Sequence, residues 1–442
     1  MSHQVSESSQ HTHSVIGYKG EPACLMVKQS QGLEGSVRLA GAKNAALVVM
    51  ASLLLTRGKS LLRNVPASAD VYNMVQLLQE LGAEVHFDDV HNVVSVDTTH
   101  VYGYSVSADL MNKMRASVLV LGPLLATQGK AEIAFPGGCV IGDRPIDYHL
   151  KNFAKMGVIV TEHDGLLSAS VDCLHNRNLL LEYPSVGATE NILMAAVLTE
   201  GTTKIINAAL EPEVFDLIDV LKKMGACVDI EVPATIKITG VKTLHSVDHA
   251  IIFDRLEAGA LLLAGAITGG YVIVPEAPAH SMGLFLMKLQ EMGHIILIGP
   301  QGTGVKIKAT KKPKAVSIKT SPYPSFPTDL QAPMTAALVL SHGTSVVQET
   351  VFENRLMHAR ELVKMGAQIE VTHGSTAHIR GVEALYGTQV IASDIRASCA
   401  LVLAGLAANG TTTITGIHHW KRGYQALEKK LQELGALIEL FE

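Results

Sequence analysis

The segment Ala45–Gly58, AALVVMASLLLTRG, is an apolar run closed by a glycine, and Lys59–Val65, KSLLRNV, follows it directly. The continuous apolar run predicts a buried helix, and glycine fits the left-handed residue that often ends one. The alternation in KSLLRNV predicts a strand. The run from Ala45 to Leu55 is far shorter than the ~20 residues that a membrane-spanning helix needs. The segment therefore predicts a buried helix followed by a strand.

The same order of helix, glycine and strand recurs six times along the chain. The glycines that close the predicted helices are Gly58, Gly129, Gly201, Gly270, Gly343 and Gly410. A second helix in each unit ends before another glycine, in the set Gly82, Gly157, Gly225, Gly293, Gly366 and Gly435. Both sets repeat about every 70 residues. Each unit is expected to hold two helices and a small sheet, so the predicted fold class is α/β.

The ends of the chain and the number of units predict the domain organisation. The sixth unit stops short of its closing strands, and two amino-terminal segments, Leu25–Lys28 and Ser36–Leu39, are expected to complete its sheet. Six units divide into two lobes of three. We expect a disordered extension over 1–22, a first lobe over 44–250 that carries Cys139, and a second lobe over 23–43 plus 251–442. The cleft between the lobes is the expected ligand site.

The composition argues against several classes of protein. Of 442 residues 48% are hydrophobic and 17% charged, and the net charge of -5 gives no general attraction to nucleic acid or to an anionic membrane. The amino terminus lacks the basic start and apolar core of a signal peptide. The five cysteines show no Cys-x-x-Cys spacing, which argues against disulfides and zinc. We expect a cytoplasmic protein without metal, cofactor or membrane insertion, and the oligomeric state stays open.

Charged residues recur at the expected starts of the first helix of each unit. Counting back about 14 residues from each closing glycine reaches Lys43, Arg115, Gly187, Arg255, Asp329 and Arg396. A cation at a helix start opposes the helix dipole, whereas the free N–H groups there attract anions. One such cation would be an ordinary solvated residue. Several at one repeated position indicate an anionic ligand.

A second group of reactive side chains lies in the linkers between strand and helix. The loop Pro136–Pro145, PGGCVIGDRP, holds Cys139 and Arg144 among three glycines, and Arg355 and Arg422 lie in the equivalent linkers of units five and six. The cysteine is either an incidental residue of a tight turn or a thiol presented for chemistry. Together with the helix starts, these linkers predict a cleft for a substrate with several negative charges and a proton to move.

Eight motifs, in this order, resemble those of the UDP-N-acetylglucosamine enolpyruvyltransferases. They are Gly41–Leu47 (GAKNAAL), Met114–Ser117 (MRAS), the Pro136–Pro145 loop, Pro184–Thr189 (PSVGAT), Phe326–Asp329 (FPTD), Thr350–Arg355 (TVFENR), Asp394–Ser398 (DIRAS) and Arg422–Tyr424 (RGY). The match covers nearly everything from Leu25 onward. The resemblance implies two lobes, each an inside-out α/β barrel of three repeated units, which agrees with the repeat count.

The resemblance also implies a reaction and a role for each matching residue. The enolpyruvyl group of phosphoenolpyruvate would move to the 3'-hydroxyl of UDP-N-acetylglucosamine, with release of phosphate. Cys139 would donate a proton, Asp329 would accept the hydroxyl proton or orient the hydroxyl, and Lys43 would assist catalysis. Phosphoenolpyruvate would be bound by Lys43, Asn44, Arg144, Arg396 and Arg422. The UDP-sugar site would be lined by Arg115, Arg144, Pro145, Ile146, Asp147, Tyr148, Ser185, Val186, Gly187, Asp329 and Val351.

Two other functions fit the same fold. The sister family that acts on shikimate 3-phosphate usually has a serine-rich segment after its lysine and no loop cysteine, whereas this chain has Asn44–Ala46 and Cys139. A non-catalytic UDP-sugar-binding relative would be expected to have lost Cys139, Asp329 or Lys43. The chain departs from some family members at Tyr183, where they carry a basic residue. The implied role is the first committed step of peptidoglycan synthesis, and the loop cysteine implies sensitivity to fosfomycin.

Overall fold

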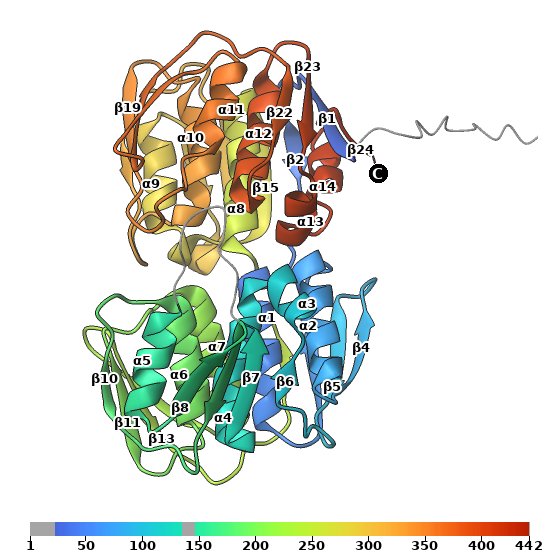
Figure 1. Cartoon of the computed structure of the whole chain (residues 1–442). Helices are drawn as coiled ribbons and strands as arrows, with labels where there is room; N and C mark the ends of the chain where they lie inside the picture. The colour runs from blue at the N-terminus through green and yellow to red at the C-terminus, as the bar shows by residue number, and fades with distance from the viewer. Residues whose placement is uncertain (1–22, 135–145, 442) are drawn as a thin grey trace, which may run out of the picture.

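The computed structural model describes residues 23–134 and 146–441, and these residues form six sheets of four strands each. Figure 1 shows the two lobes, one above the other. Every sheet has one internal order: its first strand runs parallel to the second, and the other two strands are antiparallel to their neighbours, as in β10-β11-β13-β12. No helix in the described part of the chain is long and apolar enough to span a bilayer.

The first lobe holds units one to three. Unit one consists of α1 (Lys43–Ser52), η1 (Leu53–Leu55), β3 (Lys59–Arg63), α2 (Ala69–Glu80), β4 (Glu84–Asp88), β5 (Val93–Asp97) and the distant strand β14 (Asp248–Ala250). Unit two consists of β6 (Ser105–Val106), α3 (Ala108–Lys113), η2 (Arg115–Val120), α4 (Leu121–Gln128), β7 (Lys130–Ala134), α5 (Asp147–Lys155), β8 (Ile159–His163) and β9 (Leu166–Ser170). Unit three consists of β10 (Asn178–Leu180), α6 (Val186–Ala196), β11 (Thr202–Ile206), α7 (Pro212–Lys223), β12 (Cys227–Glu231) and β13 (Thr235–Thr239).

The second lobe holds units four to six. Unit four consists of β2 (Glu34–Ser36), α8 (Arg255–Thr268), β15 (Tyr271–Pro278), η3 (Ala279–Ser281), α9 (Gly283–Glu291), β16 (Ile295–Ile298), η4 (Pro300–Gly302) and β17 (Thr303–Lys308). Unit five consists of β18 (Ile318–Lys319), η5 (Thr328–Leu330), α10 (Gln331–Leu338), β19 (Thr344–Gln348), α11 (His358–Lys364), β20 (Gln368–Thr372) and β21 (Thr376–Arg380). Unit six consists of β22 (Gln389–Ile391), α12 (Ile395–Ala407), β23 (Thr411–Thr415), α13 (His418–Gly423), α14 (Leu427–Glu433), β24 (Ile438–Phe441) and β1 (Cys24–Lys28).

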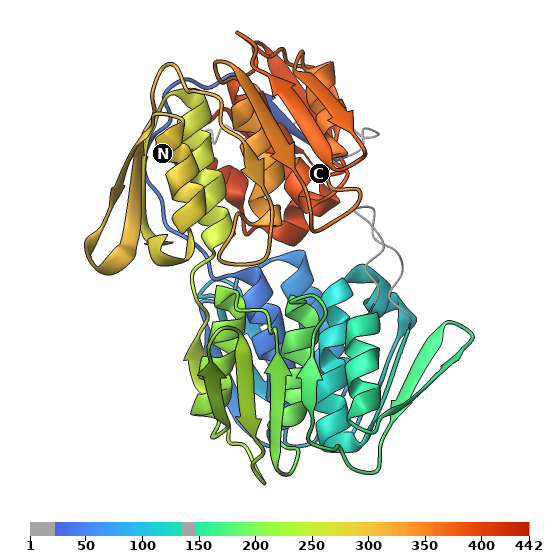
Figure 2. The ribbon, with the colours of Figure 1, turned by 90° about the vertical axis from the view of Figure 1, so that its left-hand side faces the viewer.

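Both lobes contain helices that are buried on almost every side. In α1 every residue except Asn44 is buried, and α8 and α12 are buried along nearly their whole length. A helix that is apolar all round belongs in a core. In the second lobe α8, α10 and α12 pack against one another, and the sheets lie on the outside (Figure 2). The hydrophobic core of the first lobe spans 42–251, and that of the second combines 25–39 with 256–438. Each lobe is thus an inside-out α/β barrel.

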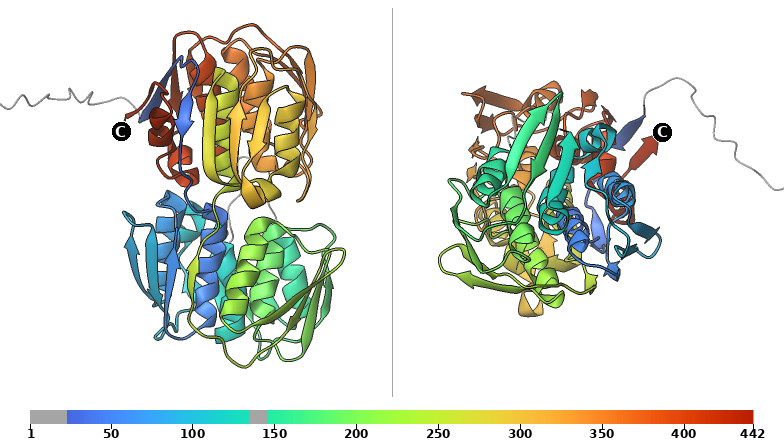
Figure 3. Two further views of the ribbon diagram at one scale, coloured as in Figure 1. Left: turned by 180° about the vertical axis from the view of Figure 1, so that it is seen from behind. Right: turned by 60° about the horizontal axis from the view of Figure 1, so that its bottom comes forward.

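The two amino-terminal strands belong to different sheets. Strand β1 lies between β23 and β24 in unit six, with Leu25 opposite Ile414 and Leu440, which confirms the prediction for this strand. Strand β2 instead runs parallel to β15 in unit four, with Glu34 opposite Tyr271, and the blue strand can be followed in Figure 3. The prediction that both strands complete unit six is therefore wrong for the second one. The reason is that β14, which precedes α8, stays paired with β3 in the first lobe, so unit four takes its parallel strand from the amino terminus.

The chain crosses between the lobes twice, and the two crossings lie side by side. The Ala42 N–H donates to the Ile252 carbonyl at 2.7 Å, and Gly41 and Phe253 form an isolated antiparallel bridge. At Gly41 an added Cβ would lie 1.8 Å from the carbonyl oxygen of Asn64, so a side chain has no space there. The lobes are therefore joined by one short double-stranded connection directly beside Lys43.

Glycine positions follow the predicted repeat in all but one case. The glycines after the second helices have φ between 96° and 105° in all six units. In unit four the left-handed residue that ends α8 is Gly269, with φ 74°, and not the predicted Gly270. Gly270 is needed for a different reason, because a Cβ there would lie 2.1 Å from the Leu33 carbonyl oxygen. The backbone leading into β2 passes directly against it.

We expect Gly381→Ala to destabilise the second lobe. Gly381 follows β21, and a Cβ at this position would lie 1.6 Å from the carbonyl oxygen of Ser341, which the backbone cannot vacate cheaply. Overpacking of this kind costs about 1–3 kcal/mol in the free energy of unfolding. Urea unfolding followed by circular dichroism measures it. Gly283→Ala is the matched control, because a Cβ at the first residue of α9 has no atom within 4 Å. Equal unfolding midpoints for the two variants would contradict the expectation.

Candidate active site

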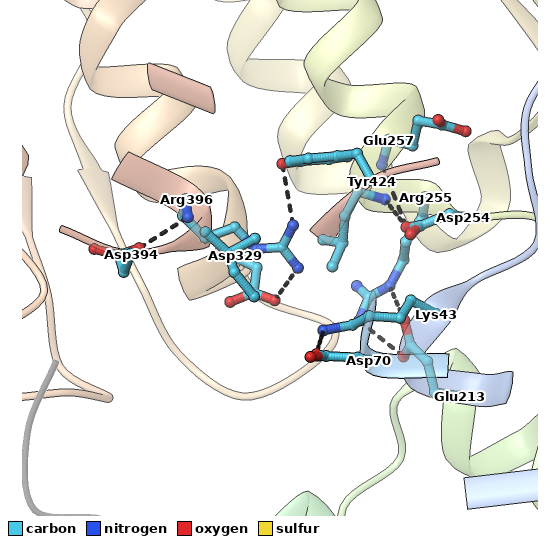
Figure 4. A network of polar contacts seen from close by, with 12 residues as sticks. Lys43, Asp70, Glu213, Asp254, Arg255, Glu257, Asp329, Asp394, Arg396 and Tyr424 are labelled. Atoms are coloured by element: carbon cyan, nitrogen blue, oxygen red, sulfur yellow. Dashed lines mark hydrogen bonds and ion pairs between the residues drawn. The ribbon is translucent and has the colours of Figure 1, made fainter. Parts of the chain in front are cut away.

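The six residues predicted at helix starts all lie where the sequence placed them. Lys43 begins α1, Arg115 begins η2 and Arg255 begins α8. Gly187 and Arg396 are the second residues of α6 and α12, and Asp329 is the second residue of η5. Figure 4 shows four of them, Lys43, Arg255, Asp329 and Arg396, in one network between the lobes. The repeat frame therefore brings charged side chains from different units to one place.

One buried carboxylate joins two of the predicted phosphoenolpyruvate-binding cations. Asp70, in the first turn of α2, accepts from Lys43 Nζ at 2.9 Å through Oδ2 and from Arg422 Nε at 2.8 Å through Oδ1. Lys43, which the predicted boundary placed in the second lobe, begins α1 of the first lobe, and Arg422, in α13, belongs to the second. Burial by itself raises the pKa of Asp70, but Lys43 and Arg422 outweigh it and lower the pKa below its ordinary value. The Asp70 carboxylate is therefore ionised. Lys43, Asp70 and Arg422 together form the Asp70 triad, which connects the two lobes.

Two arginines hold the carboxylate of Asp329. Arg355 Nη2 donates to Oδ1 at 2.8 Å, and Arg396 Nη2 donates to Oδ2 at 2.6 Å. Both guanidinium groups are buried, whereas the Asp329 side chain keeps 24% of its surface exposed. The prediction that Asp329 lies among arginines is confirmed. An ionised carboxylate fixed by two charge-assisted bonds, with part of its surface open, is well placed to accept a proton or to orient a hydroxyl.

The Arg396 guanidinium also reaches Tyr424, which lies beside a buried cysteine. Arg396 Nη1 donates to the Tyr424 hydroxyl at 3.1 Å. Cys399 neighbours this pair, and burial raises the pKa of its thiol to about 11, although Tyr424 and Arg396 act in the opposite direction. A thiol with that pKa stays protonated and unreactive at neutral pH. Cys399 is therefore a packing residue of α12 and a poor candidate for the reactive cysteine.

Further polar contacts connect the two lobes around this cluster. Arg255 Nε and Nη2 donate to the two carboxylate oxygens of Glu213, both at 3.1 Å, and both side chains are buried. Gln425 accepts from the Ala67 N–H at 3.1 Å and donates to Asn92 Oδ1 at 2.9 Å. Arg255 was predicted only as a helix-start cation. It joins the two lobes through its buried ion pair with Glu213.

A small cavity lies between the lobes at the centre of these contacts. It has a volume of about 10 Å³, room for about one water molecule, and is lined from the first lobe by Lys43 and Ser68 and from the second by Glu257 and Tyr424. The Ser68 hydroxyl is buried and has no hydrogen-bond partner in the described residues. Asn44 stands next to Lys43 and is the exposed residue of the otherwise buried helix α1. A small cavity thus lies at the lobe boundary beside Lys43, and the ligand cleft between the lobes stays a prediction.

Apart from Arg115 in η2 and Asp329 in η5, the residues predicted for the UDP-sugar site fall on three separate segments. Asp147 begins α5 and forms an ion pair with Lys151 at 3.4 Å, while Ile146 before it is buried. Ser185 caps α6, and its hydroxyl accepts from the Ala188 N–H at 3.4 Å. The Val351 N–H donates to a Glu349 carboxylate oxygen at 2.8 Å. Within the described residues, none of these three contacts joins its segment to Lys43, Asp70 or Arg422.

Tyr183 links these segments electrostatically. It lies two residues before Ser185, and its pKa is raised by burial first and then by Glu211, Glu349 and Tyr148. Tyr148 is on α5, and Glu349 is two residues before Val351, in the second lobe. Charges from both lobes therefore act on the Tyr183 hydroxyl.

Several predicted residues lie outside the described part of the chain. Cys139, Arg144 and Pro145 belong to 135–145, and only the backbone of Arg115 is described. Sequence reasoning in turn missed Asp70, Glu213 and Glu349. An aspartate in the first turn of a helix is ordinary capping chemistry, so nothing local distinguished Asp70. Its partners stand 27 and 352 residues away along the chain.

The chain is similar to named enzymes over almost its full length. It matches the family model of EPSP synthase (3-phosphoshikimate 1-carboxyvinyltransferase) over residues 27–431. The UDP-N-acetylglucosamine 1-carboxyvinyltransferase of Geobacter metallireducens is 44% identical over 94% of this chain and 98% of that protein. UDP-N-acetylglucosamine 1-carboxyvinyltransferase 1 of Caldanaerobacter subterraneus subsp. tengcongensis is 46% identical over 93% of this chain and 98% of that protein. UDP-N-acetylglucosamine 1-carboxyvinyltransferase 2 of Carboxydothermus hydrogenoformans is 46% identical over 94% of this chain and 98% of that protein.

Solved structures show the same fold at lower identity. The enolpyruvyl transferase NikO from Streptomyces tendae has a TM-score of 0.86 at 24% identity, covering 95% of this chain and 99% of that one. EPSP synthase from Acinetobacter baumannii has a TM-score of 0.74 at 18% identity, covering 95% and 100%. With sequence matches over both lobes and this shared fold, the chain belongs to the EPSP synthase family and, within it, to the UDP-N-acetylglucosamine 1-carboxyvinyltransferases.

Proposed function

We propose that this protein transfers the enolpyruvyl group of phosphoenolpyruvate to the 3'-hydroxyl of UDP-N-acetylglucosamine and releases phosphate. The observation that carries the proposal is the Asp70 triad, in which Lys43 and Arg422 from opposite lobes converge on one point. Phosphoenolpyruvate has a phosphate and a carboxylate, and charge-assisted hydrogen bonds from lysine and arginine bind both groups. A substrate anion at this point would replace interactions that Asp70 now makes and would be enclosed between the lobes.

The proposed chemistry divides between a proton donor and a proton acceptor. Cys139 gives a proton to C3 of phosphoenolpyruvate, and C2 becomes electrophilic. The 3'-hydroxyl oxygen attacks C2 and loses its proton to Asp329, which forms a tetrahedral ketal. C3 then returns a proton to the Cys139 thiolate while the bond from C2 to the phosphate oxygen breaks, which completes the enolpyruvyl ether. The departing phosphate takes up one proton, which balances the proton that Asp329 gained and then releases to solvent. Asp329 supports this division because Arg355 and Arg396 fix its carboxylate while part of that side chain stays exposed.

The roles of the remaining residues follow the family resemblance. Lys43, Asn44, Arg144, Arg396 and Arg422 would hold phosphoenolpyruvate. The segments that carry Tyr148, Ser185 and Val351 would line the UDP-sugar site together with Arg115, Arg144 and Pro145. A cytoplasmic location, a place at the first committed step of peptidoglycan synthesis, and hence a part in cell shape and division, complete the proposal. Three relatives that are 44–46% identical to this chain carry the name of this transferase.

A coupled assay of phosphate release tests the proposed function. Phosphate is expected to appear from phosphoenolpyruvate when UDP-N-acetylglucosamine is present and to stay at background without an acceptor. Release with shikimate 3-phosphate in place of the UDP-sugar would assign the protein to the sister activity. Release with neither acceptor would leave a non-catalytic UDP-sugar-binding protein, which binding calorimetry with UDP-N-acetylglucosamine then measures.

Cys139→Asp is expected to keep turnover and to abolish covalent labelling by fosfomycin. An aspartic acid side chain can still give a proton to C3, so turnover should stay within about tenfold of the unsubstituted protein. The pH optimum of turnover should move to lower pH, because a carboxyl group is protonated only around and below its pKa of about 4. The epoxide loses its sulfur nucleophile. Intact-mass spectrometry and phosphate release measure both effects, with Cys227→Ser, an exposed cysteine on β12, as the matched control. Labelling that persists in Cys139→Asp would identify a different reactive cysteine.

A further inference from the structure

The carboxylate of Glu349 holds together three segments of the second lobe. Glu349 directly follows β19 and is 3% exposed. Its Oε1 accepts from the Thr320 hydroxyl at 2.9 Å, the Val351 N–H at 2.8 Å and the Phe352 N–H at 3.3 Å. Its Oε2 accepts from the Thr328 hydroxyl at 2.9 Å. One buried side chain therefore ties the end of β18, the start of η5 and the loop after β19 to one another.

Two of these segments carry residues that the proposed reaction uses. Thr328 is the residue before Asp329, and both lie in η5. The loop after β19 carries Val351, predicted to line the UDP-sugar site, and Arg355, which donates to Asp329. Asp329 is thus held from two sides: directly by Arg355 and Arg396, and through the backbone of η5 by the bond from Thr328 to Glu349.

The repeat supplies an internal comparison for this position. The residue that directly follows the equivalent strand is Asn64 in unit one and Asn207 in unit three. Each asparagine donates one side-chain hydrogen bond to a carbonyl of the segment beside it, Asn64 to Ile251 and Asn207 to Leu181, both at 2.9 Å. In these two units a single hydrogen bond from a side-chain amide connects the strand end to the neighbouring segment. Unit five instead has a carboxylate with four donors, although burying a carboxylate costs more than burying an amide.

We propose that Glu349 is a positioning residue for the reaction, which fixes Asp329 and the Val351 loop at one mutual distance so that the acceptor hydroxyl meets the Asp329 carboxylate. This rests on the proposed function. All four donors are uncharged groups, two hydroxyls and two backbone N–H groups, so the carboxylate orders backbone and does not neutralise a cation. A displacement of the catalytic group by about 1 Å can reduce turnover by up to about a hundredfold. Loss of the Glu349 bonds should therefore reduce kcat more than it changes substrate binding.

Thr328→Val is the central variant of the test. Valine matches threonine in size and removes only the bond between η5 and Glu349. We expect kcat to fall by about tenfold or more, with KM for UDP-N-acetylglucosamine and for phosphoenolpyruvate within about twofold. Thr412→Val is the matched control, because Thr412 is a fully buried threonine of β23 whose hydroxyl has no partner in the described residues. Its kcat should equal that of the unsubstituted protein.

Two substitutions at Glu349 complete the experiment. Glu349→Gln keeps an acceptor toward Val351 and presents an N–H to the Thr328 hydroxyl, which can accept, so kcat should stay within about threefold. Glu349→Ala removes all four hydrogen bonds that the carboxylate accepts and should lower kcat by about a hundredfold. If Glu349→Ala does not fold, Thr328→Val still tests the positioning role. An unchanged kcat in Thr328→Val beside an active unsubstituted protein would overturn the positioning role. No phosphate release by the unsubstituted protein would instead overturn the proposed function, so the two failures are distinct.

Discussion

Asp329→Asn is expected to lower kcat by about two to four orders of magnitude, the usual contribution of a positioned acid or base. Asparagine keeps the shape of the side chain and one acceptor for Arg355 or Arg396, but it cannot take up the proton of the attacking hydroxyl. Because its size is conserved, UDP-N-acetylglucosamine should bind with a Kd within about threefold of the original. Single-turnover phosphate release measures the chemical step, and calorimetry measures the binding.

The Asp329 prediction separates proton transfer from electrostatic support. Arg355 and Arg396 are buried and both donate to this carboxylate. If the role of Asp329 were only to neutralise them, Asp329→Asn would lose stability and retain a kcat within tenfold of the original. That result would remove Asp329 from the proposed chemistry. Thermal unfolding of the same variant, run beside the kinetics, shows which of the two properties changed.

Asp70→Asn is expected to weaken both the folded state and the use of phosphoenolpyruvate. Asparagine leaves Lys43, whose side chain is 10% exposed, without a counter-charge. Removing one partner of a buried ion pair costs about 3–5 kcal/mol, and the lower end is expected because the Arg422 side chain is 31% exposed and can turn toward water. We further expect kcat/KM for phosphoenolpyruvate to fall by about tenfold or more, since Lys43 and Arg422 lose the group that orients them.

The stability effect of Asp70 has a definite dependence on pH. The folded-state pKa of Asp70 lies below its ordinary value. At a pH near these two values, Asp70 therefore binds fewer protons in the folded chain than in the unfolded chain. Its contribution is therefore fully present above the unfolded pKa of about 3.9 and is lost as the pH falls through the folded pKa. The difference in unfolding midpoint between Asp70→Asn and the original protein should be constant near neutral pH and shrink below about pH 4.

Asp248→Asn is the matched control for Asp70→Asn. Asp248 lies in the same lobe and also pairs with an arginine through both oxygens, Arg63 at 3.0 and 2.9 Å. Both side chains are more than half exposed, at 57% and 52%. Water screens such a pair, so its loss should leave the unfolding midpoint nearly unchanged. An equal decrease in the unfolding midpoint of the two variants would mean that burial of the Asp70 triad adds nothing to the free energy of unfolding.

The features that the sequence predicted well are those set by local chemistry. An apolar run closed by glycine specifies a buried helix wherever it occurs, so six copies specified six units and their helix starts. Lys43, Arg255, Asp329 and Arg396 were located by this count before any contact was known. The surroundings of Asp329 also followed, because Arg396 stands at the equivalent start of the next unit and its helix packs against α10.

The features that the sequence could not predict depend on which segments meet. Strand β2 pairs with β15 because β14 is already paired in the other lobe, and no property of Glu34–Ser36 states this. Asp70 and Glu349 look like an ordinary helix-start aspartate and a strand-end glutamate. Their partners come from linkers and helices of other elements, so their importance appears only when those elements are placed. The roles of Cys139 and Arg144 stay predictions from resemblance.

The position of β1 sets the order in which the protein can fold during synthesis. Its two neighbours, β23 and β24, pair with it through Thr411–Ile414 and Ile438–Phe441, and they leave the ribosome only after the whole first lobe. The first lobe can close while the second still lacks three of the four strands of that sheet, since the sheets of the first lobe use residues only up to Ala250. The nascent chain must therefore keep an apolar strand without partners for several hundred residues of elongation, which makes β1 a natural client for a chaperone.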